Sequence, residues 1–242
     1  MNLIIDVGNS YVKFAVFQQN NLIHKSIVEL FNFDTFYNEI KGKFLGIEAV
    51  IVSSVGKLEA ENIQQIKRDF KVLLLDSNTK LPFKNLYKTP KTLGVDRLAL
   101  VSASVKQFPD SNVLIIDAGT CITYDFVNSK NEYFGGAISP GIRLRYQSLN
   151  NFTANLPLLD AEMPKEIIGD STVSAIHSGV INGILKELDG IIDEYQKKYP
   201  DLTVILTGGD ANFLSNQLKN SIFANSNFLL EGLNYILEFN TN

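Results

Sequence analysis

The chain has 242 residues, 45% of them hydrophobic and 20% charged, with a formal net charge of −4. This length is enough for one large domain or for two domains of roughly 110–130 residues, and the composition is that of a globular chain rather than a disordered or fibrous one. An acidic chain without a Lys/Arg cluster disfavours nucleic acid as a partner.

The N-terminal sequence and the cysteine content predict the compartment. No basic segment precedes the first apolar run, and no run approaches the ~20 apolar residues that cross a bilayer. Cys121 is the single cysteine, so an internal disulfide is excluded, in agreement with a reducing compartment. We therefore expect a cytoplasmic protein that is neither secreted nor embedded in a membrane.

Residues 3–16 (LIIDVGNSYVKFAV) predict a β-hairpin. An apolar, β-branched strand ends in Asp6, Gly8 supplies a turn, and an alternating segment forms the second strand. An Asp-x-Gly sequence at a strand end is also an ordinary hairpin turn, so one such copy does not define a function.

Residues 87–97 (YKTPKTLGVDR) lead into a predicted helix. The apolar residues that follow have helical spacing: Leu98, Val101, Val105 and Phe108. Asp96 and Arg97 therefore lie at or near a helix N-terminus. An acidic residue is common there because it interacts favourably with the helix dipole, so position alone leaves open whether Asp96 is structural or functional.

Residues 114–127 (LIIDAGTCITYDFV) repeat the first hairpin. At an offset of 111, six of the fourteen positions are identical to residues 3–16. Two such turns predict two lobes of similar plan, with both turns facing a shared cleft. Glycine turns suit a polyphosphate, because backbone N–H groups approach the oxygens closely, and Asn9, Ser10 and Thr120 add uncharged donors. Asp6 and Asp117 would then hold the cations that neutralise the phosphates.

The remainder of the chain adds four patterns. Residues 135–141 (GGAISPG) are glycine-rich, and residues 147–169 predict the end of a short helix and a loop. A helix capped by Asp170 or Ser171 follows, with a small-residue face suited to close helix packing across a dimer: Ala175, Gly179 and Gly183. Residues 204–210 (VILTGGD) predict a strand that enters a Gly-Gly turn. P-loop, Rossmann and H-E-x-x-H motifs are absent from the sequence, and His177 fits a structural role better than a ligand role.

Together, the two hairpins and residues 204–210 resemble the phosphate-1, phosphate-2 and adenosine motifs of the superfamily of actin, sugar kinases and heat-shock chaperones. This resemblance implies an α/β fold of two ribonuclease-H-like lobes, with mixed β-sheets flanked by helices and an ATP cleft between them. We expect the N-terminal lobe to span residues 1–110 and the C-terminal lobe residues 111–242.

The pattern Y-x-x-P-x-x-L-G-x-D-R between the hairpins, and G-G-x-I-x-P-G after them, resemble type III pantothenate kinases. Val95 replaces the usual alanine of the first pattern, and Cys121 replaces an alanine of the second phosphate motif. The resemblance implies transfer of the ATP γ-phosphoryl group to the 4′-hydroxyl of pantothenate, with Mg²⁺ and a monovalent cation, K⁺ or NH₄⁺, as cofactors. It also implies a homodimer.

The resemblance implies a role for each matching residue. Asp96 would be the catalytic base. The substrate pocket would comprise Tyr87, Gly94, Val95, Asp96, Arg97 and, from the neighbouring subunit, Thr172. The nucleotide would contact the first hairpin and the second turn at Asp6, Val7, Gly8, Asn9, Ser10, Tyr11, Val12, Lys13 and Thr120. Asp6 and Asp117 would hold the metal ions.

Two rival functions share part of this pattern. Another sugar or acid kinase, or an exopolyphosphatase-like hydrolase, would share the phosphate motifs but has no need of residues 87–97. A nucleotide-dependent regulator is the non-enzymatic alternative, and the acidic composition together with the lack of a helix-turn-helix extension disfavours it.

Overall fold

The computed structural model describes residues 1–8, 11–54 and 58–241, which divide into two compact units. The first unit comprises Met1–Pro109, Asn131–Tyr133 and Asn227–Asn242; the second comprises Asp110–Lys130 and Phe134–Ser226. The chain therefore passes from the first unit to the second within one residue of the expected boundary. Two later segments, which that boundary placed in the C-terminal lobe, belong to the first unit.

The first unit is built on a five-stranded mixed sheet of order β3-β2-β1-β4-β5. Its strands are β1 (Asn2–Val7), β2 (Tyr11–Gln18), β3 (Asn21–Glu29), β4 (Ala49–Ser54) and β5 (Lys71–Leu74). Its helices are α1 (Phe33–Lys43), α2 (Ala60–Asp69), α3 (Val95–Gln107) and α8 (Phe228–Thr241), and short 3-10 turns cover Leu30–Asn32 and Pro90–Thr92. The first three strands are antiparallel, whereas β4 and β5 run parallel to β1.

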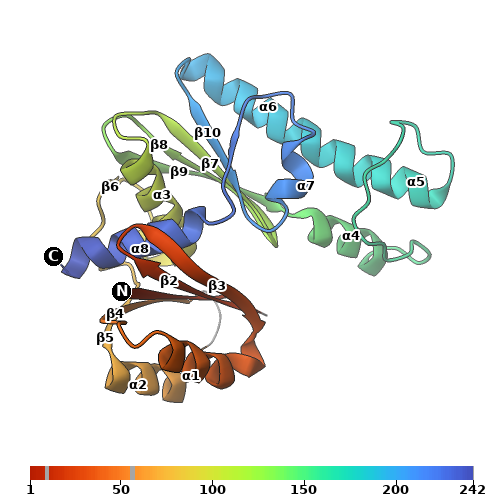
Figure 1. Cartoon of the computed structure of the whole chain (residues 1–242). Coiled ribbons are helices and arrows are strands. Elements are labelled where there is room, and N and C mark those ends of the chain that lie inside the picture. Colours follow the sequence, from red (N-terminus) through yellow and green to blue (C-terminus); the bar gives the residue numbers. More distant parts are fainter. Residues whose placement is uncertain (9–10, 55–57, 242) are drawn as a thin grey trace. The chain divides into compact units, whose positions relative to one another are not determined.

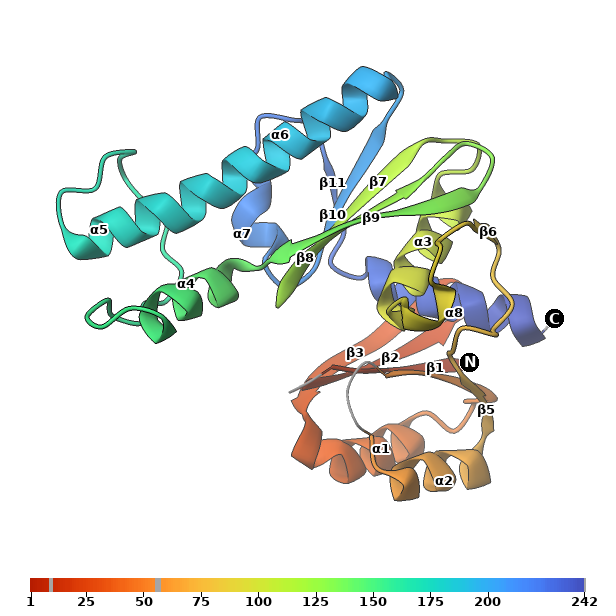
Figure 2. The ribbon, with the colours of Figure 1, turned by 180° about the vertical axis from the view of Figure 1, so that it is seen from behind.

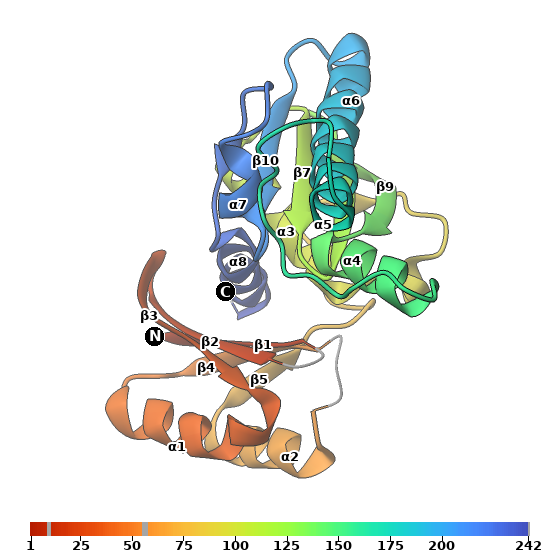
Figure 3. The same cartoon turned by 90° about the vertical axis from the view of Figure 1, so that its right-hand side faces the viewer.

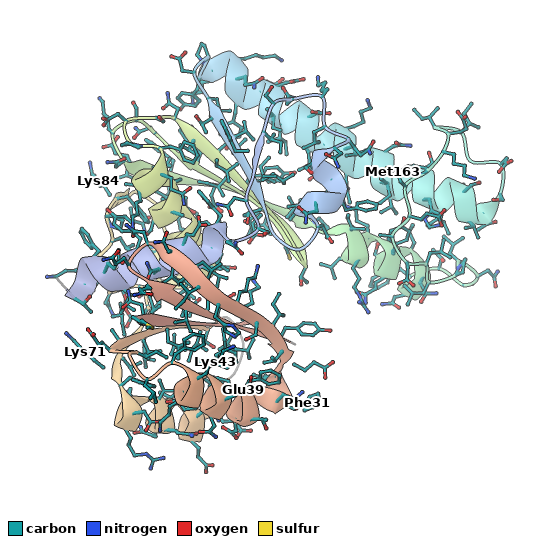
Figure 4. The ribbon with its side chains drawn as sticks, viewed as in Figure 1. Phe31, Glu39, Lys43, Lys71, Lys84 and Met163 are labelled. Atoms are coloured by element: carbon teal, nitrogen blue, oxygen red, sulfur yellow. The ribbon has the colours of Figure 1, made fainter. Side chains whose placement is uncertain are left out.

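The two faces of this sheet carry different helices because apolar side chains alternate along each strand. α1 and α2 cover the face that carries Ile5, Phe14 and Val52 (Figures 1 and 3). Exposed charged residues such as Glu39 and Lys43 lie elsewhere on α1 (Figure 4). The opposite face packs against α8 and part of α3.

The C-terminal helix α8 completes the second face of the first sheet. Its buried apolar side chains pack with Ile4, Ile51 and Ala99 in one cluster: Leu230, Leu233, Ile236 and Leu237. A Cβ atom at Gly232 would overlap the backbone carbonyl of Ala99, so α8 approaches α3 as closely as a glycine allows. Helix α8 therefore belongs to the framework that holds α3.

The second unit is built on a sheet of order β11-β10-β7-β8-β9-β6. The strands are β6 (Lys84–Asn85), β7 (Val113–Ala118), β8 (Cys121–Val127), β9 (Glu132–Pro140), β10 (Thr203–Thr207) and β11 (Phe223–Ala224). The helices are α4 (Ile142–Asn151), α5 (Thr172–His177), α6 (Gly183–Lys198) and α7 (Ala211–Ser215); a π-helical turn, Ser178–Asn182, joins α5 to α6. Of these elements, β6 and the first two residues of β9 are grouped with the first unit. Helix α6 lies along the sheet (Figure 2) and buries Ile184, Leu188 and Ile192 against it.

The two sheets share one plan. β7 pairs antiparallel with β8 and parallel with β10, as β1 pairs with β2 and β4, and β11 then follows β10 in parallel as β5 follows β4. The expected α/β fold, two mixed sheets flanked by helices, is confirmed. No helix within the described ranges is long and apolar enough to cross a membrane.

The strand registers correct the ungapped alignment of the two hairpins. Asp6 faces Lys13 in the first hairpin, but Asp117 faces Thr123 in the second, not Tyr124. Three residues separate β1 from β2 and only two separate β7 from β8, so the offset of 111 holds for the first strands and falls to 110 in the second strands. Sequence identity alone does not detect this deletion, because the shorter turn leaves the apolar alternation intact.

Candidate active site

The first hairpin holds a buried carboxylate at the end of β1. Asp6 is only 6% exposed, and its Oδ2 atom lies 3.2 Å from the ammonium nitrogen of Lys13 on the facing strand. The Gly8 N–H group donates a 2.9 Å hydrogen bond to the carbonyl of Tyr11 and closes the hairpin, with Val7 and Val12 paired just inside it. Asn9 and Ser10, which we expect to contact the nucleotide, lie outside the described residues.

Asp6 and Lys13 occupy the sheet face that packs against α8 and α3, since they alternate with core residues of the opposite face. Ser53 of β4 is in register with Asp6 on the same face and is fully buried. Its hydroxyl oxygen has no hydrogen-bond partner among the described residues. Sequence reasoning did not identify Ser53, because a serine at the end of an apolar strand has no distinctive pattern.

Asp96 lies in the first turn of α3, and the predicted helix start is confirmed. Its Oδ1 atom accepts a 2.9 Å hydrogen bond from the N–H group of Arg97. Gly94 is the N-cap residue, and a Cβ atom there would overlap that same carboxylate oxygen. The glycine of the G-x-D-R pattern therefore leaves the space that the Asp96 side chain occupies.

Arg97 and Tyr87 lie side by side in the first unit. Arg97 is 5% exposed, and its guanidinium carbon lies 5.6 Å from the centre of the Tyr87 ring, within the range of a cation–π contact. Tyr87 in turn stacks on the fully buried Tyr133, with ring centres 6.2 Å apart. Tyr133 lies shortly before the GGAISPG segment and was not identified from the sequence. It lies next to Tyr87 because β6 pairs with β9.

In the second unit, Asp117 lies at the end of β7 between two threonines. Thr123 of β8 and Thr207 of β10 are both in register with it, so all three side chains share one face of the sheet. Gly208, with φ of +97°, turns the chain beside this position: a Cβ atom there would overlap Asp117 Oδ1 and the carbonyl of Ala118. The Gly208-Gly209 turn is therefore packed directly on the end of β7.

Thr120 forms the exposed tip of the second turn, and the GGAISPG segment supports it. The Gly141 N–H group donates a 3.1 Å hydrogen bond to the carbonyl of Thr120. A Cβ atom at Gly141 would overlap the carbonyl of Gly119, so only glycine fits here. Gly141 also begins α4 as its N-cap residue.

A partly buried polar network, which was not predicted from the sequence, fixes the GGAISPG segment to α4 and α6. Arg145 of α4 donates to the carbonyl of Pro140 (2.9 Å), to Ser139 Oγ (2.9 Å) and to Glu187 Oε2 of α6 (2.5 Å). The Tyr124 hydroxyl donates to the other Glu187 oxygen at 2.9 Å. Burial opposes ionisation of Glu187, but hydrogen bonds from Arg145, Ser139 and Tyr124 outweigh it and lower the pKa of the carboxyl group.

Asp210 and His177 each make a hydrogen-bond contact within the second unit. The Asp210 N–H group donates to the carbonyl of Ala118 (2.9 Å), and burial raises the pKa of the Asp210 carboxyl group. His177 is buried and its Nδ1 atom lies 2.8 Å from the Tyr146 hydroxyl oxygen. This contact within the second unit agrees with a structural role for His177.

Thr172 is exposed at the first position of α5, beside an apolar cavity of about 590 Å³. Ser171, one of the two expected caps, begins the helix. Its hydroxyl oxygen accepts from the Ser174 N–H group at 3.2 Å, and its own N–H group donates to Ser174 Oγ at 2.9 Å. The cavity is lined by Thr172, Ala175 and Gly179 together with Arg145 and Leu156.

The expected site residues fall into two groups. Asp6, Lys13, Tyr87 and residues 94–97 belong to the first unit, and Asp117, Thr120 and Thr172 to the second. Among the described residues no three His, Cys, Asp or Glu side chains gather into a metal cluster.

Comparisons with solved structures show which known proteins share this fold. The chain shares its fold with glucokinase from an Antarctic psychrotroph, at a TM-score of 0.54 with 11% identity over 98% of both chains. It is also similar to a conserved protein assigned to the Baf family of transcriptional activators from Campylobacter jejuni, at a TM-score of 0.63 with 21% identity over 98% of both chains. The fold is that of the two-lobed, actin-like sugar kinases.

Sequence comparison then gives the family. The model of the type III pantothenate kinase family matches residues 2–194, and the type III pantothenate kinase of Christiangramia forsetii is 54% identical over 99% of both chains. The chain therefore belongs to the type III pantothenate kinase family. The activity of this family is the ATP-dependent phosphorylation of pantothenate, the first step of coenzyme A biosynthesis.

Proposed function

We propose that this pantothenate kinase uses Asp96 as the base that receives the proton of the substrate's primary hydroxyl group. The hydroxyl oxygen forms a bond to the γ-phosphorus of ATP, the bond from that phosphorus to the β,γ-bridging oxygen breaks, and ADP leaves. Phosphoryl transfer of this kind needs alignment and charge neutralisation more than covalent help from the protein. The residues therefore act mainly by position.

The observation that carries this assignment is the local geometry of the Asp96 carboxylate. One oxygen is fixed by the Arg97 N–H group, and Gly94 leaves the space it needs. A helix N-terminus favours the ionised carboxylate that a base must be before it accepts a proton. A carboxylate fixed in one orientation is what alignment with an attacking hydroxyl requires.

The pantothenate pocket, in this proposal, begins with Tyr87, Gly94, Val95 and Arg97. The Arg97 guanidinium group supplies a buried positive charge beside an aromatic ring, and pantothenate carries a carboxylate. An arginine held by stacking offers hydrogen bonds of fixed direction to a carboxylate. We assign Arg97 to orientation of the substrate, not to the chemical step.

The phosphates and cations are assigned to the two hairpins. Asp6 would hold Mg²⁺, directly or through water, with Lys13 beside it, and Asp117 would hold a monovalent cation, K⁺ or NH₄⁺. Bound cations would neutralise the phosphate oxygens as charge moves toward ADP. Residues 7–13 and Thr120 would contact the nucleotide.

A homodimer completes the proposal. Gly179 and Gly183 have open space where a Cβ atom would be, and large apolar side chains nearby in the sequence are strongly exposed: Phe152, Ile167, Ile168 and Val173. Exposed apolar groups of this size support burial against a second copy. Thr172, beside the same face, would reach the pantothenate of the partner subunit.

The direct test is a coupled assay of ADP release with the purified protein. We expect ADP release with ATP, Mg²⁺, K⁺ and pantothenate together, and little with glucose or acetate in place of pantothenate. For the hydrolase, a separate assay measures the inorganic phosphate released from polyphosphate, and we expect little of it. Turnover with one of these alternatives and none with pantothenate would support a rival kinase or hydrolase. Binding of ATP without turnover of any of them would support the regulator.

A further inference from the structure

The equivalent positions opposite the two motif aspartates carry different groups. Lys13 faces Asp6 in the first unit, and Thr123 faces Asp117 in the second. Lys13 places a positive charge 3.2 Å from its carboxylate. Thr123 places an uncharged hydroxyl group at the corresponding position. Because the two sheets have the same strand order and register, Lys13 and Thr123 occupy equivalent positions.

The Thr123 hydroxyl group is buried in a manner that calls for a ligand. Its oxygen has essentially no solvent contact and no hydrogen-bond partner among the described residues. A buried hydroxyl group without a partner is destabilising, so such groups are normally satisfied by a hydrogen bond or a ligand in the functional state. Facing residues of an antiparallel pair have Cβ atoms about 5 Å apart, which places the Thr123 side chain next to that of Asp117.

The chemistry around Asp117 suits a cation that binds oxygen. The register places Thr207 on the other side of Asp117, and Gly208 passes close to the carboxylate oxygen. Carboxylate, hydroxyl and carbonyl oxygens are the ligands that hard cations take.

We infer that the monovalent cation beside Asp117 takes the place that the Lys13 ammonium group takes beside Asp6, and that the Thr123 hydroxyl oxygen is one of its ligands. This inference rests on the proposed monovalent cation requirement and adds a residue to it. The Lys13 ammonium group is a permanent positive charge beside Asp6, and an exchangeable ion supplies the positive charge beside Asp117. The substitution Thr123→Lys would therefore make the exchangeable ion unnecessary.

The test compares wild type with Thr123→Lys, Thr123→Val, Thr123→Ser and Thr123→Met in KCl and NaCl at equal ionic strength. Two quantities are measured: the K⁺ concentration for half-maximal turnover, and the rise in melting temperature when KCl replaces NaCl with a non-hydrolysable ATP analogue bound. The second quantity reports ion binding without turnover, because a ligand that binds only the folded state raises its stability. Thr123→Ser keeps the hydroxyl group, and Thr123→Met matches lysine in length without its charge.

We expect Thr123→Val to raise the half-maximal K⁺ concentration about tenfold or more and to shrink the K⁺-dependent shift in melting temperature. Thr123→Ser should remain close to wild type. Thr123→Lys should show turnover and melting temperature that no longer distinguish KCl from NaCl, whereas Thr123→Met should be inactive in both salts.

Several outcomes would overturn the inference. One such outcome is that wild type depends on K⁺ while Thr123→Val does not differ from it in either quantity. The ion site would then exist, but Thr123 would not be one of its ligands. If neither the turnover nor the melting temperature of wild type depends on K⁺, the proposed cation requirement is wrong, and this inference is wrong with it. Should Thr123→Lys fail to fold, the valine and serine variants still decide the role of the hydroxyl group.

Discussion

At the scale of single residues, Asp96 is the position where a structural role and a catalytic role make different predictions. Its carboxylate accepts a backbone hydrogen bond at the start of α3. Asparagine retains an oxygen that accepts the same bond but does not act as a base. The two roles can therefore be separated by one substitution.

We expect Asp96→Asn to lower kcat by about 10²–10⁴-fold, the usual effect of losing a general base, with the dissociation constant of ATP little changed. Its melting temperature should stay near that of wild type, because the helix-start interaction is worth only about 1 kcal/mol. Retention of more than about a tenth of wild-type kcat would refute the assignment. Asp6→Asn is the informative comparison, since it should weaken ATP binding as well as turnover.

A substitution at Gly94 tests whether the position of the Asp96 carboxylate matters for catalysis. A methyl group at this position would overlap Asp96 Oδ1, and the flexible carboxylate would move more readily than the backbone. We expect Gly94→Ala to lower kcat by about tenfold or more through misalignment, without a matching loss of stability.

The matched control is Gly190→Ala in α6, where a Cβ atom meets nothing within 4 Å. That variant should keep full activity and gain up to about 1 kcal/mol of stability, because alanine favours a helix over glycine. Equal activity of the two variants would show that the space beside Gly94 is not needed for catalysis.

At the scale of secondary-structure elements, Glu187 joins α6 to α4 and β8, and its contribution to stability depends on pH. Its pKa in the folded protein lies below the ordinary value of 4.5. The stabilisation is therefore fully present above about pH 4.5 and is lost as pH falls through the lowered folded-state pKa. A glutamine side chain at this position cannot ionise, so the Glu187→Gln variant would lack this dependence.

We expect Glu187→Gln to lower the free energy of unfolding by about 1–3 kcal/mol near neutral pH, since it weakens charged hydrogen bonds to a half-buried arginine. The difference from wild type should narrow below about pH 4.5. Urea unfolding at several pH values measures both effects. Glu194→Gln, on the same helix in an exposed ion pair with Lys197, should change stability by less than about 1 kcal/mol at any pH; a larger effect there would mean that the assay does not isolate the network.

The sequence predicted the elements whose signals are local and missed the relations that depend on pairing between distant segments. Short patterns predicted both hairpins, a helix that begins near Asp96 and the strand before the Gly-Gly turn, and all are confirmed. The contact of Lys13 with Asp6 and the position of Thr123 depend on register, which a one-residue difference in turn length alters. The Arg145–Glu187 pair depends on how α4 and α6 pack, which no spacing along the chain encodes.

At the scale of the whole molecule, the proposed homodimer predicts that two inactive variants can restore each other's activity, which a monomeric enzyme cannot do. If each active site takes Asp96 from one subunit and Thr172 from the other, then Asp96→Asn and Thr172→Ala damage different halves of the same site. A mixed dimer would contain one site with both substitutions and one with neither.

We expect the two variants, each nearly inactive alone, to regain activity when they are unfolded together and refolded as a mixture. Recovery should approach roughly a quarter of wild type, because half of the dimers are mixed and each mixed dimer has one intact site of two. Light scattering should give twice the chain mass of 27.0 kDa. A mixture that stays inactive while it scatters as a dimer would place Thr172 in the same site as its own Asp96.

The place of α8 in the first unit also sets an order for synthesis on the ribosome. Between Gln107 at the end of α3 and Phe228 at the start of α8 lie 120 residues, and they include the whole of the second unit. The N-terminal sheet emerges first, yet one of its faces lacks the leucines that cover it until the last helix has left the exit tunnel. Of the cluster around Ile4 and Ile51, only the part formed by residues before α8 is then present, so the unit that is translated first is completed last.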